Sequence, residues 1–295
     1  MELRKENFRM ERDIVGEIYV PACAYYGAQT LRAAENFPIT GMELHPEMIR
    51  SLALVKKAAA QTNRACGVLP PRIADAIAKA CDDILAGKFH NQFLVDPLQG
   101  GAGTCANMTA NEVIANRAIE LLGGRKGNYG LVHPNDHVNC GQSTNDVYPS
   151  CGKMTTARLL DRLYQKLAAL QSALAEKALA FDHVLKMGRT QLQDAVPIRL
   201  GQEFRAYALA VGRDIRRLRL AGEDMHVLTL GGTAIGTGIN ASAGYARTIV
   251  AAVSRLSGEQ YVQAEDLIDG TQNLDCYTVV SGALKSCAVN LSKIC

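Results

Sequence analysis

The amino-acid sequence predicts a mainly α-helical protein, with a small mixed N-terminal domain followed by a bundle of long helices. The first 140 residues alternate turn-rich stretches with helical patterns of ordinary length. From about residue 147 onward, apolar residues recur at spacings of three and four over much longer stretches. Hydrophobic residues make up 48% of the 295 residues and charged residues 21%, which excludes a disordered chain. We therefore expect a mixed, mostly helical domain at residues 1–140 and a central helical bundle at 141–295.

The N-terminal domain opens with a stretch rich in turn-forming residues, at 20–41, and two helices are expected after it. Apolar residues recur at helical spacing over residues 48–63 and again over 71–86. Pro70 and Pro71 lie between the two patterns. Because proline cannot continue a helix but suits its first turn, these residues separate two distinct helices.

A glycine-rich loop at residues 99–104 leads into a third helix, expected at 107–122. Thr109 and Glu112 have the spacing of a capping box near its start, and a Gly-Gly pair follows its end. The loop formally matches a dinucleotide fingerprint, but no strand precedes it, so nucleotide binding is not expected. A glycine-rich turn at a helix N-terminus can instead receive a carboxylate, and the plainer alternative is that Thr104 caps the helix.

The second half of the chain predicts long amphipathic helices. Leucines from residue 159 to 174 form an apolar stripe on a helix expected to run to about Met187. A second long helix is expected after Pro197, and a short connection between two such helices implies an antiparallel pair. Two further helical patterns cover residues 244–256 and 275–295.

Charge and cysteine usage limit the partners and the compartment. The net charge of +3 is too small to imply a nucleic-acid or membrane partner. The charged N-terminus has no apolar core of the length that a signal peptide needs, and no window approaches a membrane span. The nine cysteines are scattered and odd in number, which is typical of reduced thiols. We expect a cytoplasmic protein.

The segment His133-Pro134-Asn135-Asp136-His137 invites a zinc interpretation, because histidine is a common ligand. Pro134 disfavours a helix that carries both histidines on one face. We therefore expect a polar turn or a carboxylate contact here, and no metal site.

Residues 142–146, Gln-Ser-Thr-Asn-Asp, place five hydrogen-bonding side chains in a row before the first long helix. An N-cap needs only one of them, so the surplus suggests a cluster of uncharged donors, with an elaborate capping loop as the alternative. Residues 188–194 form a polar connection between the two long helices. The sequence leaves open whether this connection is solvated or points into a cleft.

Four ordered segments resemble the aspartase/fumarase superfamily. They are GGAGTCANMTANEVIANRA, HPNDHVNCGQSTNDVYPS, GRTQLQDAVPIRLGQEF and GGTAIGTGIN, and the opening ERDIVGEIYVPACAYYGAQTLRAAENFPITG is similar as well. The resemblance thus runs along essentially the whole chain. It is closer to the aspartate ammonia-lyases than to the fumarases, because Gln191 stands where fumarases have histidine and residues 264–295 are aspartase-like. Argininosuccinate and adenylosuccinate lyases are less similar.

The resemblance implies a reversible anti-elimination in which L-aspartate loses ammonia to give fumarate. It implies no organic cofactor and allows for activation by magnesium. Removing a proton from Cβ places negative charge on the β-carboxylate, and preorganised donors directed at that charge lower the barrier. The residues that match the family's substrate positions are Thr104, Ser143 and Thr144 for the β-carboxylate, Asn145 and Gln191 for the leaving amino group, and Thr190 for the α-carboxylate.

Two further implications concern a second site and the general base. His133, Asn135 and Asp136 match a second dicarboxylate site of fumarases. The family's base is a serine on a mobile Gly-Ser-Ser loop, and no such segment occurs up to Cys295. We therefore expect no catalytic base within the chain, an incomplete bundle, no third domain, and impaired activity of the 295 residues alone.

The family assembles its active sites from three subunits of a homotetramer, which implies a homotetramer here. Two alternatives stay open from the sequence. One is a fumarate hydratase of the same superfamily, and the other is a non-catalytic helical assembly fragment.

Overall fold

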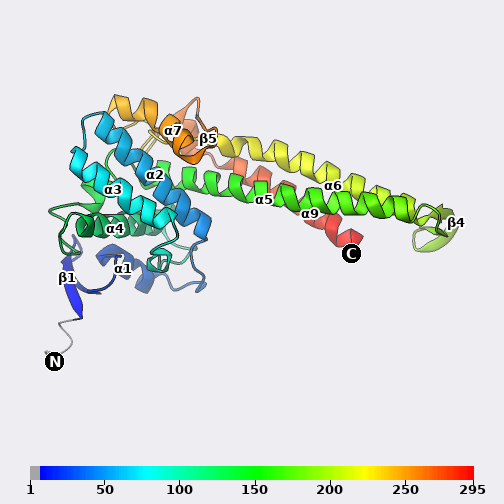
Figure 1. The fold of residues 1–295 in the computed structure, drawn as a ribbon, viewed down its shortest axis with the longest axis horizontal. Coiled ribbons are helices and arrows are strands. Elements are labelled where there is room, and N and C mark those ends of the chain that lie inside the picture. Colours follow the sequence, from blue (N-terminus) through cyan, green and yellow to red (C-terminus); the bar gives the residue numbers. More distant parts are fainter. Residues whose placement is uncertain (1–6) are drawn as a thin grey trace. The chain divides into compact units, whose positions relative to one another are not determined.

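The computed structural model describes residues 7–295, and residues 1–6 of the expected N-terminal domain lie outside the described part (Figure 1). The structure is mainly helical with long helices and small sheets, as predicted. It forms two compact units. The first comprises the chain up to Thr155 together with His226–Asn273, and the second comprises Thr156–Met225 together with Leu274–Cys295.

This division differs from the expected domain boundary between residues 140 and 141. Val147 and Cys151 are buried in the same hydrophobic core as the helices of the N-terminal half. Leu230, Tyr245 and Ile249, which come much later along the chain, belong to that core too. The first unit therefore includes segments on both sides of the long-helix region, because their apolar side chains are buried together.

The first unit contains an antiparallel hairpin, a helical core and two short parallel strands. Its elements are β1 (Phe8–Arg12), β2 (Glu17–Pro21), α1 (Ala28–Asn36), α2 (Pro46–Ala65), α3 (Pro71–Leu85), η2 (His90–Gln92), η3 (Gly101–Gly103), α4 (Thr104–Leu121), η4 (Pro134–Val138), the start of α5 (Thr144–Ala180), β5 (Val227–Leu228), α7 (Ala243–Ser257), β6 (Val262–Gln263) and α8 (Leu267–Gln272). The helices expected at 48–63 and 71–86 are confirmed as α2 and α3. The turn-rich stretch at 20–41 contains the end of β2 and all of α1.

One expected capping box is wrong. The third helix, α4, begins at Thr104 with Gly103 as its N-cap, so Thr109 lies well inside the helix. The Thr109 hydroxyl donates to the carbonyl of Cys105, one turn earlier. Glu112 binds the start of a different helix, α1, as described below.

The second unit consists of long helices and one hairpin. Its elements are the remainder of α5, β3 (Leu185–Thr190), β4 (Gln193–Arg199), α6 (Leu200–Gly222), η5 (Glu223–His226) and α9 (Asp275–Ile294). The leucine stripe of α5 packs with the apolar side of α6, as the sequence predicts, and α9 covers them with Cys276, Val280 and Cys287. In Figure 1 the two long helices run side by side, with the β3–β4 hairpin joining their ends.

The expected extent of the first long helix is wrong at its C-terminal end. The helix stops at Ala180, a turn follows, and Leu185 to Met187 already belong to strand β3, which pairs with β4. The connection between the long helices is therefore a hairpin rather than a simple loop. Left-handed backbone at Gln191 (φ +50°) and Leu192 (φ +65°) makes its turn.

Candidate functional site

The N-terminal ends of α4 and α5 lie against each other in the first unit. Gly103 has φ +92°, and a Cβ atom added there would lie 2.2 Å from the ring of Tyr148 on α5. One turn further along α4, the amide nitrogen of Asn107 donates to Oγ1 of Thr144 over 3.0 Å. Only glycine permits this close approach, and the approach brings Thr104 to the same region as Thr144.

Thr104 is the first residue of α4 and is exposed. Its hydroxyl donates to the carbonyl of Gly101 over 2.6 Å, and within residues 7–295 it accepts no backbone N–H as a cap would. Capping by Thr104, the plainer alternative above, is therefore not how this helix begins. The glycine-rich loop delivers a hydroxyl to a helix N-terminus, where the helix dipole favours an anion.

One buried carboxylate, that of Asp146, binds both the residues before α5 and a glycine-rich segment at residues 231–238. Asp146 accepts the backbone N–H groups of Ser143 (2.9 Å), Gly231 (3.0 Å) and Thr233 (3.1 Å). Asn145 adds a bond from its amide nitrogen to the carbonyl of Ala234 over 2.7 Å. Burial raises the pKa of Asp146, while the three N–H donors and a nearby lysine lower it. These bonds hold Ser143, Thr144 and Asn145 in one short row.

A fully buried lysine lies behind this row, and sequence reasoning did not find it. Nζ of Lys56, on α2, donates to Oδ1 of Asn139 over 2.7 Å and to Oε1 of Gln142 over 3.0 Å. Burial lowers the pKa of Lys56 to about 7, against the opposing effect of Cys151 and Asp146. The one available signal was a lysine in an otherwise apolar stretch of a helix.

His133 and its neighbours form a polar turn, as expected. Pro134 opens the π-helical turn η4, and Nδ1 of His133 accepts the N–H groups of Asn135 and Asp136, both over 3.2 Å. The backbone N–H of His133 donates to Nδ1 of His137 over 2.8 Å. Among residues 7–295, no group of three or more His, Cys, Asp and Glu side chains is arranged to hold a metal ion.

His133 and Asn135 also line a cavity of about 440 Å³. Its wall includes the basic side chains of Arg12 and Arg32 together with acidic ones, among them Glu112. The cavity therefore presents both signs of charge to an occupant.

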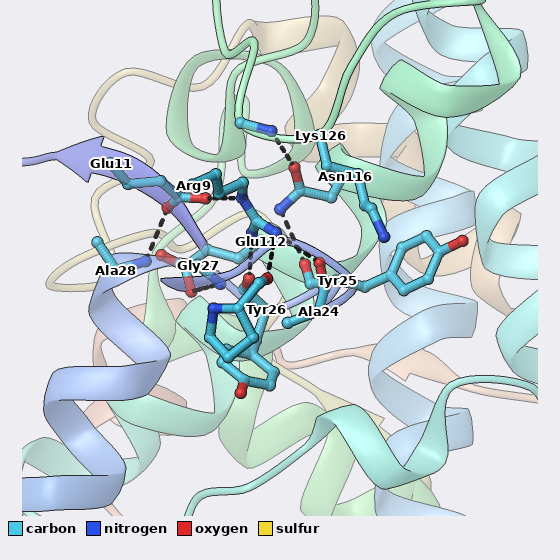
Figure 2. A network of polar contacts seen from close by, with 12 residues as sticks. Arg9, Glu11, Ala24, Tyr25, Tyr26, Gly27, Ala28, Glu112, Asn116 and Lys126 are labelled. Carbon is cyan, nitrogen blue, oxygen red and sulfur yellow. Dashed lines mark hydrogen bonds and ion pairs between the residues drawn. The ribbon is translucent and has the colours of Figure 1, made fainter. Parts of the chain in front are cut away.

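Two buried carboxylates hold the start of α1, which forms part of this wall. Figure 2 shows the network around them. Glu112 accepts the N–H groups of Gly27, Gln29 and Thr30 and the Thr30 hydroxyl, at 2.6–3.1 Å. Glu11 accepts the N–H group of Ala28 over 2.8 Å. Negative charge at a helix N-terminus satisfies the free N–H groups and suits the helix dipole.

Arg9 fixes the chain that leads into α1 (Figure 2). Its guanidinium donates to Oε1 of Glu11 over 2.7 Å and to three backbone carbonyls. These carbonyls belong to Pro21 (3.0 Å), Ala24 (2.7 Å) and Tyr26 (2.6 Å). One side chain thus provides donors to backbone carbonyls in the irregular segment between β2 and α1.

The remaining two predicted site residues belong to the second unit. Thr190 ends strand β3 and Gln191 is the first residue of the hairpin turn, and both are exposed. Arg189 and Asp194 pair across the base of this turn over 3.2 Å. The hairpin therefore presents Thr190, Gln191 and the apolar side chain of Leu192 to solvent.

A larger mixed unit, a smaller unit of long helices and a row of neutral donors where the N-terminal ends of α4 and α5 meet place the chain in the aspartase/fumarase fold class. The family described as Lyase matches residues 16–295, and the chain belongs to this family, within the aspartase/fumarase superfamily.

Named relatives include both kinds of enzyme in this class. The aspartate ammonia-lyase of Bacillus subtilis is 51% identical over 98% of this chain and 61% of its own length. A crystal structure of a "fumarate lyase:delta crystallin" from Brucella melitensis bound to cobalt has a TM-score of 0.95 and 46% identity, covering 97% of this chain and 63% of that one. A class II fumarase from Schistosoma mansoni has a TM-score of 0.92 and 33% identity, covering 97% and 64%.

The chain thus spans about 61% of the length of the aspartate ammonia-lyases that it matches. Over residues 7–295, no helix is both long and apolar enough to cross a membrane.

Proposed function

We propose that this chain carries the substrate-binding part of an aspartate ammonia-lyase, which eliminates ammonia from L-aspartate to give fumarate. The observation that carries the proposal is the row Ser143-Thr144-Asn145, held beside Thr104 at the joined ends of α4 and α5. About half of the residues are identical to those of enzymes with this activity. These side chains are neutral donors, which a carboxylate can use without introducing a competing charge.

The donors would act on the β-carboxylate. As the Cβ proton leaves, negative charge grows on this carboxylate, and Thr104, Ser143 and Thr144 are proposed to stabilise it. A single preorganised donor of this kind typically lowers the activation barrier by about 3 kcal/mol. The N-terminal end of α4 adds a favourable dipole.

The proposed contacts to the rest of the substrate come from three other residues. Asn145 and Gln191 would lie near the leaving amino group, and Thr190 would bind the α-carboxylate. An amide at residue 191 can orient an ammonium group but is a poor proton donor. This suits ammonia, which leaves more readily unaided than hydroxide does. We propose that the proton acceptor is a serine outside the 295 residues.

We propose no organic cofactor, and magnesium as an activator. Comparing the affinity of the chain for L-aspartate with added magnesium and with a chelator tests the second statement. A second dicarboxylate position is proposed at His133, Asn135 and Asp136, beside the cavity with its two arginines. A carboxylate that used the N–H groups of Asn135 and Asp136 would compete with the His133 ring, which accepts both.

We also propose a homotetramer in the cytoplasm, with a small dicarboxylate as the substrate and neither nucleic acid nor membrane as partner. The apolar side chains on the exposed faces of the long helices support association, and the nine free cysteines suit a reducing compartment.

Calorimetric titration of the purified chain with L-aspartate, fumarate and L-malate tests the substrate. We expect binding of aspartate and fumarate, weaker binding of malate, and little fumarate production. Preference for malate would favour the alternative of a fumarate hydratase, which the likeness to the Schistosoma fumarase keeps open. Binding of no dicarboxylate would favour a non-catalytic assembly fragment. Measurable fumarate production would contradict a base outside the 295 residues.

A further inference from the structure

We propose that Lys56 is a positioning residue, which fixes the direction of the Thr144 hydroxyl through Asn139 and Asn107. The inference rests on the proposed function, in which Thr144 donates to the substrate carboxylate. All four residues belong to the first unit. They form one continuous chain of hydrogen bonds from α2 through the end of η4 and α4 to the start of α5.

The first step is the orientation of Asn139. Nζ of Lys56 is fully buried, and its two contacts, 2.7 Å to Asn139 and 3.0 Å to Gln142, both go to side-chain oxygens. A lysine ammonium has donors and no acceptor, so Asn139 must turn its oxygen toward it. The other end of the same amide, Nδ2, donates to the carbonyl of Gln142 over 3.2 Å. Both ends of the Asn139 amide are therefore fixed.

The second step is the orientation of Asn107. This side chain is 1% exposed, and its Nδ2 lies 3.3 Å from the Asn139 oxygen and 3.0 Å from Oγ1 of Thr144. A flipped amide would place two oxygens against each other, so the NH₂ group must face Asn139. This orientation leaves Oδ1 of Asn107 buried without a hydrogen-bond donor among residues 7–295, which is energetically unfavourable.

The third step is the Thr144 hydroxyl itself. Its oxygen accepts from Asn107, so its hydrogen must point elsewhere. Within the part of the chain that the structure describes, this hydrogen has no acceptor. A hydroxyl held in this way can donate to an incoming carboxylate without first giving up a bond to another protein group. The buried Lys56 ammonium thus fixes the direction of the Thr144 hydroxyl, although Lys56 itself does not contact the ligand.

A double-mutant cycle on fumarate binding tests this inference. Calorimetry at pH 6, where Lys56 is protonated, compares the wild-type chain with Lys56→Met, Thr144→Val and the double variant. We expect each single substitution to weaken binding about tenfold, the usual effect of one lost hydrogen bond, and the double variant to bind no more weakly than Thr144→Val. Losses that multiply to about a hundredfold would overturn the positioning role and leave the proposed function standing.

Three further variants separate positioning from folding. Lys56→Arg keeps a group with donors only and should restore most of the affinity. Asn139→Leu interrupts the same chain of hydrogen bonds at a half-buried residue. If Lys56→Met fails to fold, Asn139→Leu takes its place and should show the same loss of fumarate affinity and the same non-additivity with Thr144→Val. Lys57→Met, at the neighbouring position, removes only an ion pair with Asp82 and should bind like the wild type.

The remaining outcomes are equally decisive. A wild-type chain that binds no fumarate would overturn the proposed function and this inference together. Wild-type binding that Thr144→Val leaves unchanged would remove Thr144 from the site, and with it the role of Lys56. An Asn139→Leu variant that folds and binds like the wild type would overturn the positioning role alone.

Discussion

At the scale of single residues, Gly103 is a site position that cannot accept a side chain without displacing its neighbours. An added Cβ atom would meet the Tyr148 ring at 2.2 Å, and φ is +92°. We expect Gly103→Ala to lower the free energy of unfolding by about 3 kcal/mol, because strain and overpacking add. Urea denaturation followed by circular dichroism measures this.

Gly123 is the matched control, since it lies just beyond the other end of the same helix. It has φ +82° and nothing within 4 Å of an added Cβ atom. Gly123→Ala should therefore cost only the strain of a left-handed backbone, about 1 kcal/mol. Equal losses for the two variants would show that the α4–α5 contact is not tightly packed.

The pH dependence of stability is a second residue-scale prediction. Burial depresses the pKa of Lys56 to about 7 from its usual 10.5. Below pH 7 both the folded and the unfolded chain hold the proton, so the full cost of burying the charge is present. Between pH 7 and 10.5 the unfolded chain holds more protons, so this contribution makes stability rise with pH.

Lys56→Met lacks this titration, and comparing it with the wild type isolates the effect. The stability of the variant minus that of the wild type should fall by roughly 3 kcal/mol between pH 6 and pH 9.5. Chemical denaturation at both pH values gives the difference. A constant difference would mean that Lys56 keeps its charge throughout this range.

At the scale of elements, the start of α1 depends on side chains from far along the chain. Arg9 donates to three backbone carbonyls and to Glu11 (Figure 2). Lysine cannot reach these acceptors together, so Arg9→Lys should cost about 2 kcal/mol of unfolding free energy. Arg12→Lys, at an exposed position of the same strand, should change stability by less than about 0.5 kcal/mol. A similar loss in both variants would contradict the bridging role of Arg9.

The β3–β4 hairpin carries strain in its turn. Leu192 has φ +65° and is 92% exposed, so it has little packing to lose. Leu192→Gly should stabilise the chain by about 1 kcal/mol, because glycine adopts this conformation freely. Val196→Gly, an exposed position in strand β4, should destabilise it instead. Thermal unfolding of both variants checks the signs, and destabilisation by Leu192→Gly would show that the leucine is engaged.

The elements differ in how far the sequence could predict them. The helices α2 and α3 follow from apolar periodicity and a proline pair, which are local signals. The sequence does not predict the hairpin after α5, because its strands pair residues that are 3 to 14 positions apart and its turn uses Gln191 and Leu192 rather than glycine or asparagine.

The candidate site, too, could be predicted from the sequence only in part. The family resemblance indicates Thr104 and the row after Gln142. Nothing local marks Asn107 as their support, and the only local sign of Lys56 is a lysine in a largely apolar stretch of helix. Both residues sit in ordinary helical patterns, and their burial and bonding arise only when α2, α4 and α5 pack. Tertiary context of this kind cannot be read from one helix at a time.

At the scale of the whole molecule, the second unit leaves a large amount of apolar surface uncovered. Its exposed apolar side chains include Leu170 on α5, Leu209 and Leu220 on α6, and Val279, Leu284 and Val289 on α9. Monomeric proteins rarely expose so many large apolar side chains on neighbouring long helices, and such surfaces mark association sites. This is the physical support for the proposed homotetramer.

Sedimentation equilibrium at micromolar concentration tests this assembly. We expect a tetrameric mass for the wild-type chain and dissociation for Leu209→Glu, because a charge in an apolar interface would lose its hydration without gaining a partner. Met42→Glu, an exposed position of the first unit, should leave the mass unchanged. A wild-type monomer would remove the basis for a site shared among subunits. Dissociation by both variants would mean that the interface extends beyond the long helices.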